Sequence, residues 1–186
     1  MTETTDLKVL ARALAFAAHK HRDQRRKGAE ASPYINHPIA LFDHLVNVGG
    51  VEDTGILCAA LLHDTIEDTE TTQAELTEHF GALISGIVAE VTDDKTLLKQ
   101  ERKIRQIEHA PHLSTRARAV KLADKTCNLG DVAERPPHHW DLERRREYFD
   151  WGKQVIDGLR GEWPVLEAAF DRQYERKPVG EPESRQ

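Results

Sequence analysis

The chain has few of the residues that mark secreted disulfide-rich proteins. Its 186 residues include only two cysteines, one methionine and 6% aromatic side chains. The cysteines, Cys58 and Cys127, lie in apolar segments with helical periodicity. We expect packed thiols rather than a disulfide, which fits a reducing compartment.

A targeting segment and a membrane span are also absent from the sequence pattern. The N-terminus M-T-E-T-T-D is acidic, and the apolar stretch after it is interrupted by Arg12, which is not the pattern of a signal peptide. No apolar run approaches the length of a membrane span. We therefore predict a cytoplasmic protein with no membrane contact.

An excess of positive charge is missing as well. The chain carries 26 Lys and Arg against 32 Asp and Glu, for a net charge of −6. Nucleic-acid-binding domains are more often basic overall, so we expect no nucleic-acid partner. The length fits one domain with a substantial core. The oligomeric state is not predicted.

Helical periodicity runs through almost the whole chain. A capping box at Thr72–Glu75 opens a short helix that should stop near Gly81. Alternating strands and repeats are not found, so the fold class is all-α, a helical bundle. We assign a single domain to residues 1–172 and a disordered tail to 173–186. Other helices are expected from about Leu7, from Pro38 to Gly49, and over 52–66, 82–92, 98–110, 114–130, 139–160 and 163–171.

The most informative segment is A-A-L-L-H-D-T-I-E-D-T, residues 59–69. An apolar run leads directly into His63 and Asp64, and Glu67 and Asp68 follow one turn later. An isolated His-Asp pair is most often a structural hydrogen-bonded pair. If the helix continues or only loosens here, however, Glu67 stacks on His63 and Asp68 on Asp64. One pair is then placed to bind a metal while the other reaches a water on it.

Two further positions strengthen the metal hypothesis. His37 precedes a proline at a helix start, where it is either a capping imidazole or a nitrogen ligand. Asp124 falls on an apolar stripe, where a carboxylate needs a cation, either a Lys or Arg or a metal. With His63 and Asp64 they supply two imidazoles and two carboxylates, a set that suits Mn²⁺, Fe²⁺, Zn²⁺ or Mg²⁺.

Such an ion favours hydroxide near neutral pH, and Glu67 and Asp68 would then handle protons. Local basic clusters in an acidic chain suggest a polyanionic small molecule. Phosphoester or pyrophosphate hydrolysis is the economical inference, although each cluster taken alone is most simply a solvated helix face. The clusters are Lys20–Lys27, Lys95–Arg105 and Arg144–Arg146.

The order H…HD…D resembles the HD superfamily of metal-dependent phosphohydrolases. The words R-R-K, P-Y-I-N-H-P, A-A-L-L-H-D-T-I-E-D-T, E-V-T-D-D-K-T and V-K-L-A-D-K-T-C-N-L closely resemble the hydrolase domain of RelA/SpoT alarmone enzymes. The resemblance covers about residues 5–170, without room for a synthetase domain. The chain is thus similar to stand-alone small alarmone hydrolases, the metazoan SpoT homologues.

This resemblance implies an all-α HD bundle that uses Mn²⁺ to remove the 3′-pyrophosphate of (p)ppGpp, giving GDP or GTP and pyrophosphate. It implies a catalytic acidic pair, Glu67 and Asp68, and four metal ligands. The implied ligands are His37, His63, Asp64 and Asp124, and the implied substrate-binding residues are Arg26, Lys27, Tyr34, Lys99, Asn128 and Arg144.

The last motif departs from the family. It usually reads K-L-A-D-R-L-x-N-x-R, whereas this chain has Thr126, Cys127 and Gly130 at the changed positions. These changes bear on packing and substrate affinity around that helix rather than on the reaction type.

Three alternatives remain. The first is another HD-type nucleotide phosphohydrolase, such as an NADPH 2′-phosphatase. The second is a catalytically inactive nucleotide sensor, and the third is a structural bundle with incidental buried polar groups. Histidines outside the motif are expected at the surface or its boundary, among them His21, and His138 and His139 in a loop. The tryptophans Trp140, Trp151 and Trp163 are expected to be packing residues.

Overall fold

The computed structural model describes residues 2–27 and 30–180, with side chains from Asp6 onward, and these residues form an all-α bundle. The only β-type pairing in the described part is an isolated bridge between Arg25 and Pro33. The predicted fold class is confirmed. The elements are α1 (Thr2–Lys20), α2 (Asn36–Asp43), η1 (His44–Val48), α3 (Thr54–Leu62), α4 (Thr65–Asp68), α5 (Gln73–Val91), α6 (Lys99–His109), η2 (Ala110–His112), α7 (Thr115–Glu134), α8 (Leu142–Asp157) and α9 (Pro164–Tyr174).

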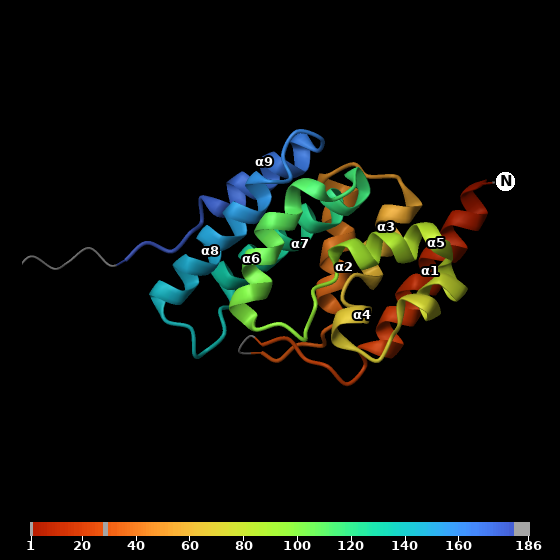
Figure 1. Cartoon of the computed structure of the whole chain (residues 1–186), viewed down its shortest axis with the longest axis horizontal. Coiled ribbons are helices and arrows are strands. Elements are labelled where there is room, and N and C mark those ends of the chain that lie inside the picture. Colours follow the sequence, from red (N-terminus) through yellow and green to blue (C-terminus); the bar gives the residue numbers. More distant parts are fainter. Residues whose placement is uncertain (1, 28–29, 181–186) are drawn as a thin grey trace, which may run out of the picture.

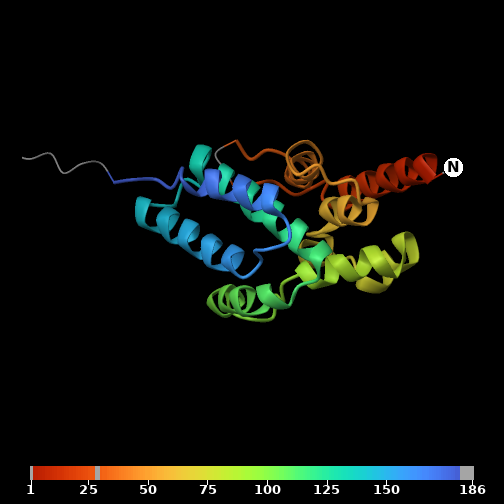
Figure 2. The ribbon, with the colours of Figure 1, turned by 90° about the horizontal axis from the view of Figure 1, so that it is seen from above.

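Helix α7 is the centre of the bundle. It contacts α2, α3 and α5 on one side and α8 and α9 on the other. Figure 1 shows α1, α3 and α5 toward the end where the N-terminus lies, and α6, α8 and α9 toward the opposite end. The view from above in Figure 2 shows the same order along an elongated molecule. Residues presented by α7 are therefore placed where the two halves meet.

Helix α3 is buried over eight of its nine residues, which matches the apolar run that follows Thr54. Asp53 caps its start by accepting hydrogen bonds from the backbone N–H groups of Gly55 and Ile56 (2.8 and 3.2 Å). At its end, Nδ1 of His63 bonds to the carbonyl of Ala60 (2.8 Å), and Oγ1 of Thr65 donates to that of Leu62 (2.7 Å). The side chains thus satisfy carbonyls that a helix end leaves free.

The expected continuous helix over 52–66 is therefore wrong. Helix α3 ends at Leu62, and the four-residue helix α4 begins after Asp64, where φ is −97° and ψ is 0°. The N–H of Asp68 still bonds to the carbonyl of Asp64 (2.8 Å), so these two residues remain one helical turn apart. The acidic pair therefore lies on a short helix that is separate from α3.

Helix α5 bends at Gly81. Oγ1 of Thr72 accepts from the N–H of Glu75 (3.1 Å), which confirms the predicted cap. Gly81 has φ of +83° and ψ of 165°, and the helix continues beyond it to Val91. The expected stop near Gly81 is thus a kink at a conformation that glycine alone adopts readily.

The predicted tail lies partly outside the described residues, since 181–186 are not described. Within 173–180, Gln173 and Tyr174 complete α9. The hydroxyl of Tyr174 donates to Oδ1 of Asp150 (2.8 Å), and Nζ of Lys177 reaches the same oxygen (2.5 Å). The first residues of the expected tail therefore contact α8.

Both cysteines are free thiols, with Cys58 buried and Cys127 half-buried. No helix among the described residues combines the length and apolarity needed to cross a bilayer.

Candidate active site

Three of the predicted metal ligands converge at the centre of the bundle. His37 from α2, His63 from the end of α3 and Asp124 from α7 each offer one ligand atom, and these atoms lie within 4.8 Å of one another. Nε2 of His37 is 3.3 Å from Oδ1 of Asp124, and Nε2 of His63 is 3.9 Å from it. All three residues are buried. Three elements distant in sequence therefore present one N/N/O donor set.

The orientation of His63 fits a metal ligand. Because Nδ1 faces the carbonyl of Ala60 at 2.8 Å, that nitrogen carries a proton, and the neutral ring has its lone pair at Nε2. Nε2 is buried and has no hydrogen-bond partner of good geometry in the described chain, although Oδ2 of Asp64 is only 2.8 Å away. Burial lowers the pKa of His63, but the charges of Asp64 and Asp124 outweigh it and raise the pKa to about 9. A site that attracts a proton this strongly also suits a cation.

Asp64 lies beside this group. Its Oδ2 is 4.0 Å from Nε2 of His37, and it accepts a hydrogen bond from the hydroxyl of Tyr34 (2.5 Å). Burial opposes ionisation of Asp64, but the charge and hydrogen bond of His63 hold its pKa well below the usual range. Asp64 is thus an anion at the cluster, tied by Tyr34 to the loop between α1 and α2.

Asp124 is held by two neighbours on α7. Nζ of Lys125 donates to Oδ2 (3.1 Å), and Nδ2 of Asn128 donates to Oδ1 (2.5 Å). Burial would raise the pKa of Asp124, but Lys125 and His37 keep it well below normal. Nη2 of Arg26 in turn donates to Oδ1 of Asn128 (3.1 Å) and to Oδ2 of Asp131 (2.5 Å). This chain of bonds connects the His37–His63–Asp124 group to the loop that carries Arg26.

The acidic pair on α4, Glu67 and Asp68, lies close to the His37–His63–Asp124 group. Oε2 of Glu67 accepts from the backbone N–H of Asp93 (3.2 Å), and Oε1 lies 3.7 Å from Nη1 of Arg102. Burial, with the nearby charges of Asp93 and Asp64, raises the pKa of Glu67 to about 7. Asp68 forms an ion pair with Lys95. Glu67 and Asp68 line one small cavity together with His37, His63 and Asp124.

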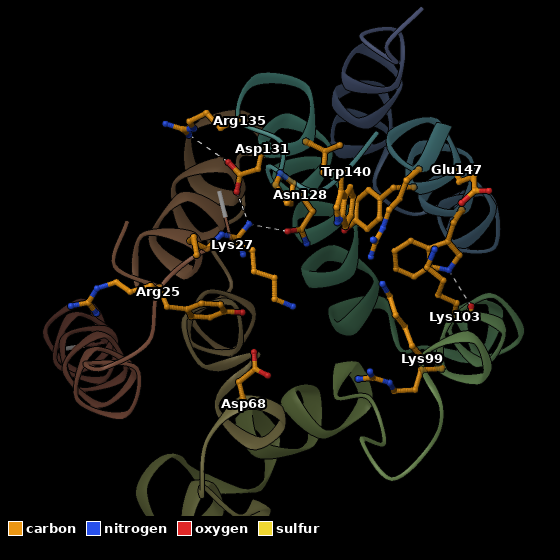
Figure 3. Close-up of a pocket in the computed structure, with 18 of the residues that line it drawn as sticks. Arg25, Lys27, Asp68, Lys99, Lys103, Asn128, Asp131, Arg135, Trp140 and Glu147 are labelled. Carbon is orange, nitrogen blue, oxygen red and sulfur yellow. Dashed lines mark hydrogen bonds and ion pairs between the residues drawn. The ribbon is translucent and has the colours of Figure 1, made fainter. Parts of the chain in front are cut away.

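A larger cavity of about 1040 Å³ opens beside the cluster. Figure 3 shows the labelled side chains of Lys27, Asp68 and Lys99 around its open centre. Burial and the charges of Arg144, Lys27 and Arg102 lower the pKa of Lys99, so cations from three elements converge here. Arg26, Tyr34, Asp68 and Asn128 line both cavities. All six predicted substrate-binding residues therefore line this space, namely Arg26, Lys27, Tyr34, Lys99, Asn128 and Arg144.

Some residues of the site were not predicted. Trp140 and Trp151, expected only as packing residues, line the large cavity with Tyr148. Both also pack against the core, so a periodicity argument sees only that role. Arg144 lies over the ring of Trp140 at 4.8 Å, and Lys125 over that of Trp151 at 4.6 Å. The pairing of aromatic rings with cations could be recognised only from the fold.

Other expectations can be compared with the structure. His138 and His139 lie in a turn, as predicted. The expectation for His21 is wrong, because this residue is 1% exposed. At the altered motif, a Cβ on Gly130 would stand 3.0 Å from Nε2 of Gln173, so the glycine leaves room for this side chain from α9. Thr126 is buried and donates to the carbonyl of Leu122 (2.8 Å).

Comparison with known proteins agrees with this geometry. The family model described as "HD domain" matches residues 13–149. The guanosine-3′,5′-bis(diphosphate) 3′-pyrophosphohydrolase MESH1 of Xenopus tropicalis is 50% identical over 171 residues, which cover 92% of this chain and 96% of that protein. The protein of the same name from Homo sapiens is 51% identical over 168 residues, covering 90% and 94%.

A solved structure is similar as well. It is described as a metazoan ortholog of SpoT that hydrolyses ppGpp and plays a role in starvation responses. It superposes with a TM-score of 0.88 at 45% identity, covering 90% of this chain and 94% of that one. The chain therefore belongs to the HD-domain family and, within it, to the family of MESH1-type SpoT homologues.

Proposed function

We propose that this protein is a metal-dependent (p)ppGpp 3′-pyrophosphohydrolase. The observation that carries the proposal is the junction of two features. A buried His37–His63–Asp124 group with an adjacent acidic pair lies beside a cavity of about 1040 Å³, whose lining includes Lys and Arg side chains from the α1–α2 loop, α6 and α8. The cavity is large enough for a nucleotide. The names of the relatives, similar over nearly their whole length, support the same activity.

The donor set fits a divalent ion held by His37, His63, Asp64 and Asp124, and we propose Mn²⁺. Mixed imidazole and carboxylate donors without thiolate suit this ion. When bound, it would supply Lewis-acid charge that stabilises the phosphoryl group and favours hydroxide near neutral pH. The hydrogen bonds from Nδ1 of His63 to the carbonyl of Ala60 and from Asn128 to Asp124 keep the ligands oriented.

The reaction breaks the bond between the ribose 3′ oxygen and the adjacent phosphorus. The oxygen of water forms the new bond to that phosphorus, pyrophosphate departs, and the 3′ oxygen takes up a proton. Glu67, with its pKa near 7, is suited to accept the proton of water and return one, because a base is most effective near the operating pH. Asp68 stands beside it on α4 and orients the water.

The chain binds the substrate through charge and stacking. Lys27, Lys99 and Arg144 neutralise phosphate groups. Arg26 and Asn128 join the nucleotide cavity to the metal ligand Asp124. Tyr34 places the loop over the cluster through its bond to Asp64. A single domain that extends beyond the predicted residue 172 to the contacts of Tyr174 and Lys177 with α8, and a cytoplasmic location with no nucleic-acid partner, complete the proposal.

The test is a product assay with ppGpp and NADPH side by side, with Mn²⁺ and with a chelator control. GDP and pyrophosphate from ppGpp at much higher kcat/KM than phosphate from NADPH is the expected result. Phosphate from NADPH alone would overturn the proposed substrate and leave a different HD phosphohydrolase.

A further inference from the structure

His21 is a buried histidine outside the metal cluster. It follows the last residue of α1 and is 1% exposed. It lines neither the small cavity around His37, His63 and Asp124 nor the large cavity of about 1040 Å³. Its Nδ1 lies 2.7 Å from Oε1 of Gln24. A buried polar ring in this position calls for a role that apolar packing would not provide.

The contacts of Gln24 determine which nitrogen of His21 carries the proton. Nε2 of Gln24 donates to the backbone carbonyl of Asp68 (2.6 Å). Because a carbonyl only accepts, the amide nitrogen must face Asp68 and the amide oxygen must face His21. Nδ1 of His21 is then the donor. Nε2 of His21 is buried without a partner in the described chain, so a proton there would be an unpaired donor.

The backbone carbonyl of Asp68 lies at the C-terminal end of helix α4. Helix α4 has only four residues, and a helix this short has too few internal bonds to hold its own end. Its last carbonyls have no partner within the helix. The side chain of Gln24, 44 positions away in sequence, provides one of these partners.

Gln24 also forms a backbone hydrogen bond within the loop between α1 and α2. Its backbone carbonyl accepts a hydrogen bond from the N–H of Tyr34 (3.0 Å). The rings of His21 and Tyr34 lie 4.8 Å apart, and the hydroxyl of Tyr34 bonds to Asp64. One residue thus braces both the acidic pair and the loop beside the metal cluster.

We propose that His21 and Gln24 form a positioning relay that sets the place of Asp68 for catalysis. The donor at Nδ1 of His21 fixes the amide of Gln24, and that amide fixes the end of α4. The inference rests on the proposed function, because the role of Asp68 does. Displacing a catalytic group by about 1 Å lowers turnover about 100-fold, so a brace at this point has a large effect on rate.

The experiment compares two substitutions of His21 in the full chain with Mn²⁺. His21→Phe keeps a ring against Tyr34 but removes the donor. His21→Asn loses the ring but places an amide N–H close to the position of Nδ1. We expect kcat for ppGpp to fall at least ~10-fold in His21→Phe with a smaller change in KM, and to recover to within ~3-fold in His21→Asn. Wild-type kcat in His21→Phe, or equal losses in both variants, would overturn the relay.

A double-mutant cycle separates positioning from general packing. In an Asp68→Asn background, His21→Phe should cause little further loss, because residues that act as a unit are not additive. A full additional ~10-fold loss there would contradict action through Asp68.

A measurement that does not depend on turnover separates the test of the relay from the test of the proposed substrate. ¹⁵N shifts of the histidine rings should show His21 as the Nδ1–H tautomer. The Nε2–H tautomer would overturn the relay even if ppGpp is hydrolysed. The Nδ1–H tautomer in a protein that leaves ppGpp intact would support the hydrogen-bond arrangement and count against the proposed substrate only.

Discussion

Glu67 accepts a hydrogen bond from the backbone N–H of Asp93, with 3.2 Å between the nitrogen and Oε2. The two residues come from α4 and from the segment after α5. One bond does not compensate the carboxylate for burial and for the charges of Asp93 and Asp64, so the pKa rises to about 7. Glu67 is therefore destabilising when ionised, as expected of a group kept for chemistry.

Glu67→Gln should stabilise the metal-free protein while removing turnover. The folded pKa of about 7 lies above the ordinary value of 4.5. Ionisation of Glu67 therefore lowers the free energy of unfolding. The full loss is present above pH 7, and there is no loss below pH 4.5. The variant should gain up to about 3 kcal/mol at pH 8, since one pKa unit corresponds to about 1.4 kcal/mol. Urea unfolding in chelator at pH 4 and pH 8 measures the gain.

The exposed Glu78 on α5 provides the matched control. Glu78→Gln should leave kcat unchanged and show no such pH-dependent gain. If Glu67→Gln raised the free energy of unfolding equally at pH 4 and pH 8, ionisation of Glu67 would not be what destabilises the folded protein.

Asp124→Asn should lower the affinity for Mn²⁺ by at least ~100-fold, because a charged ligand becomes neutral at a buried site. Asn128→Ala should weaken Mn²⁺ binding by a smaller factor of about 10, because Asn128 is not a ligand and acts on the metal by orienting Asp124. Calorimetric titration of the chelator-treated protein gives both values. Asp157→Asn, at an exposed ion pair on α8, is the control. Unchanged Mn²⁺ affinity in Asp124→Asn would refute the ligand assignment.

The sequence was sufficient to predict most of the helices and the three residues that converge in the His37–His63–Asp124 group. Periodicity identified α3, and the cap at Thr72 located the start of α5. It did not predict the break at Asp64, because that break depends on hydrogen bonds from His63 and Thr65 to the end of α3. Such local competition between side chain and helix is weakly encoded in apolar patterning.

The burial of His21 and the aromatic wall of the nucleotide cavity were out of reach for a different reason. Both depend on contacts between distant segments, such as Gln24 with Asp68 and Lys125 with Trp151. A tryptophan on a helical stripe has the same pattern whether it faces the core or a cavity. Only the arrangement of α7 and α8 separates the two cases.

Lys99→Gln should raise KM for ppGpp about 10-fold and change kcat little. Lys99 is exposed and lies among like charges, so its bond to a phosphate falls at the low end of the 1.5–3 kcal/mol typical of charged hydrogen bonds. The KM of the variant should also depend less on salt. Initial rates at two ionic strengths measure both effects. Lys153→Gln, which removes a surface pair with Asp157, should leave KM unchanged. A fall in kcat at constant KM would instead assign Lys99 to the chemical step.

Gly81→Ala and Gly86→Ala should shift stability in opposite directions, although both lie in α5. Gly81 has φ of +83°, a conformation that strains any other residue by about 1–3 kcal/mol. Gly86 is helical, and an added Cβ there meets nothing within 4 Å, so alanine should stabilise by about 0.5–1 kcal/mol. Chemical denaturation of the two variants measures the contrast. Because neither position touches the site, kcat should stay constant in both. Destabilisation by Gly86→Ala would show that the space beside α5 is occupied, whereas a neutral Gly81→Ala would show that the kink can straighten.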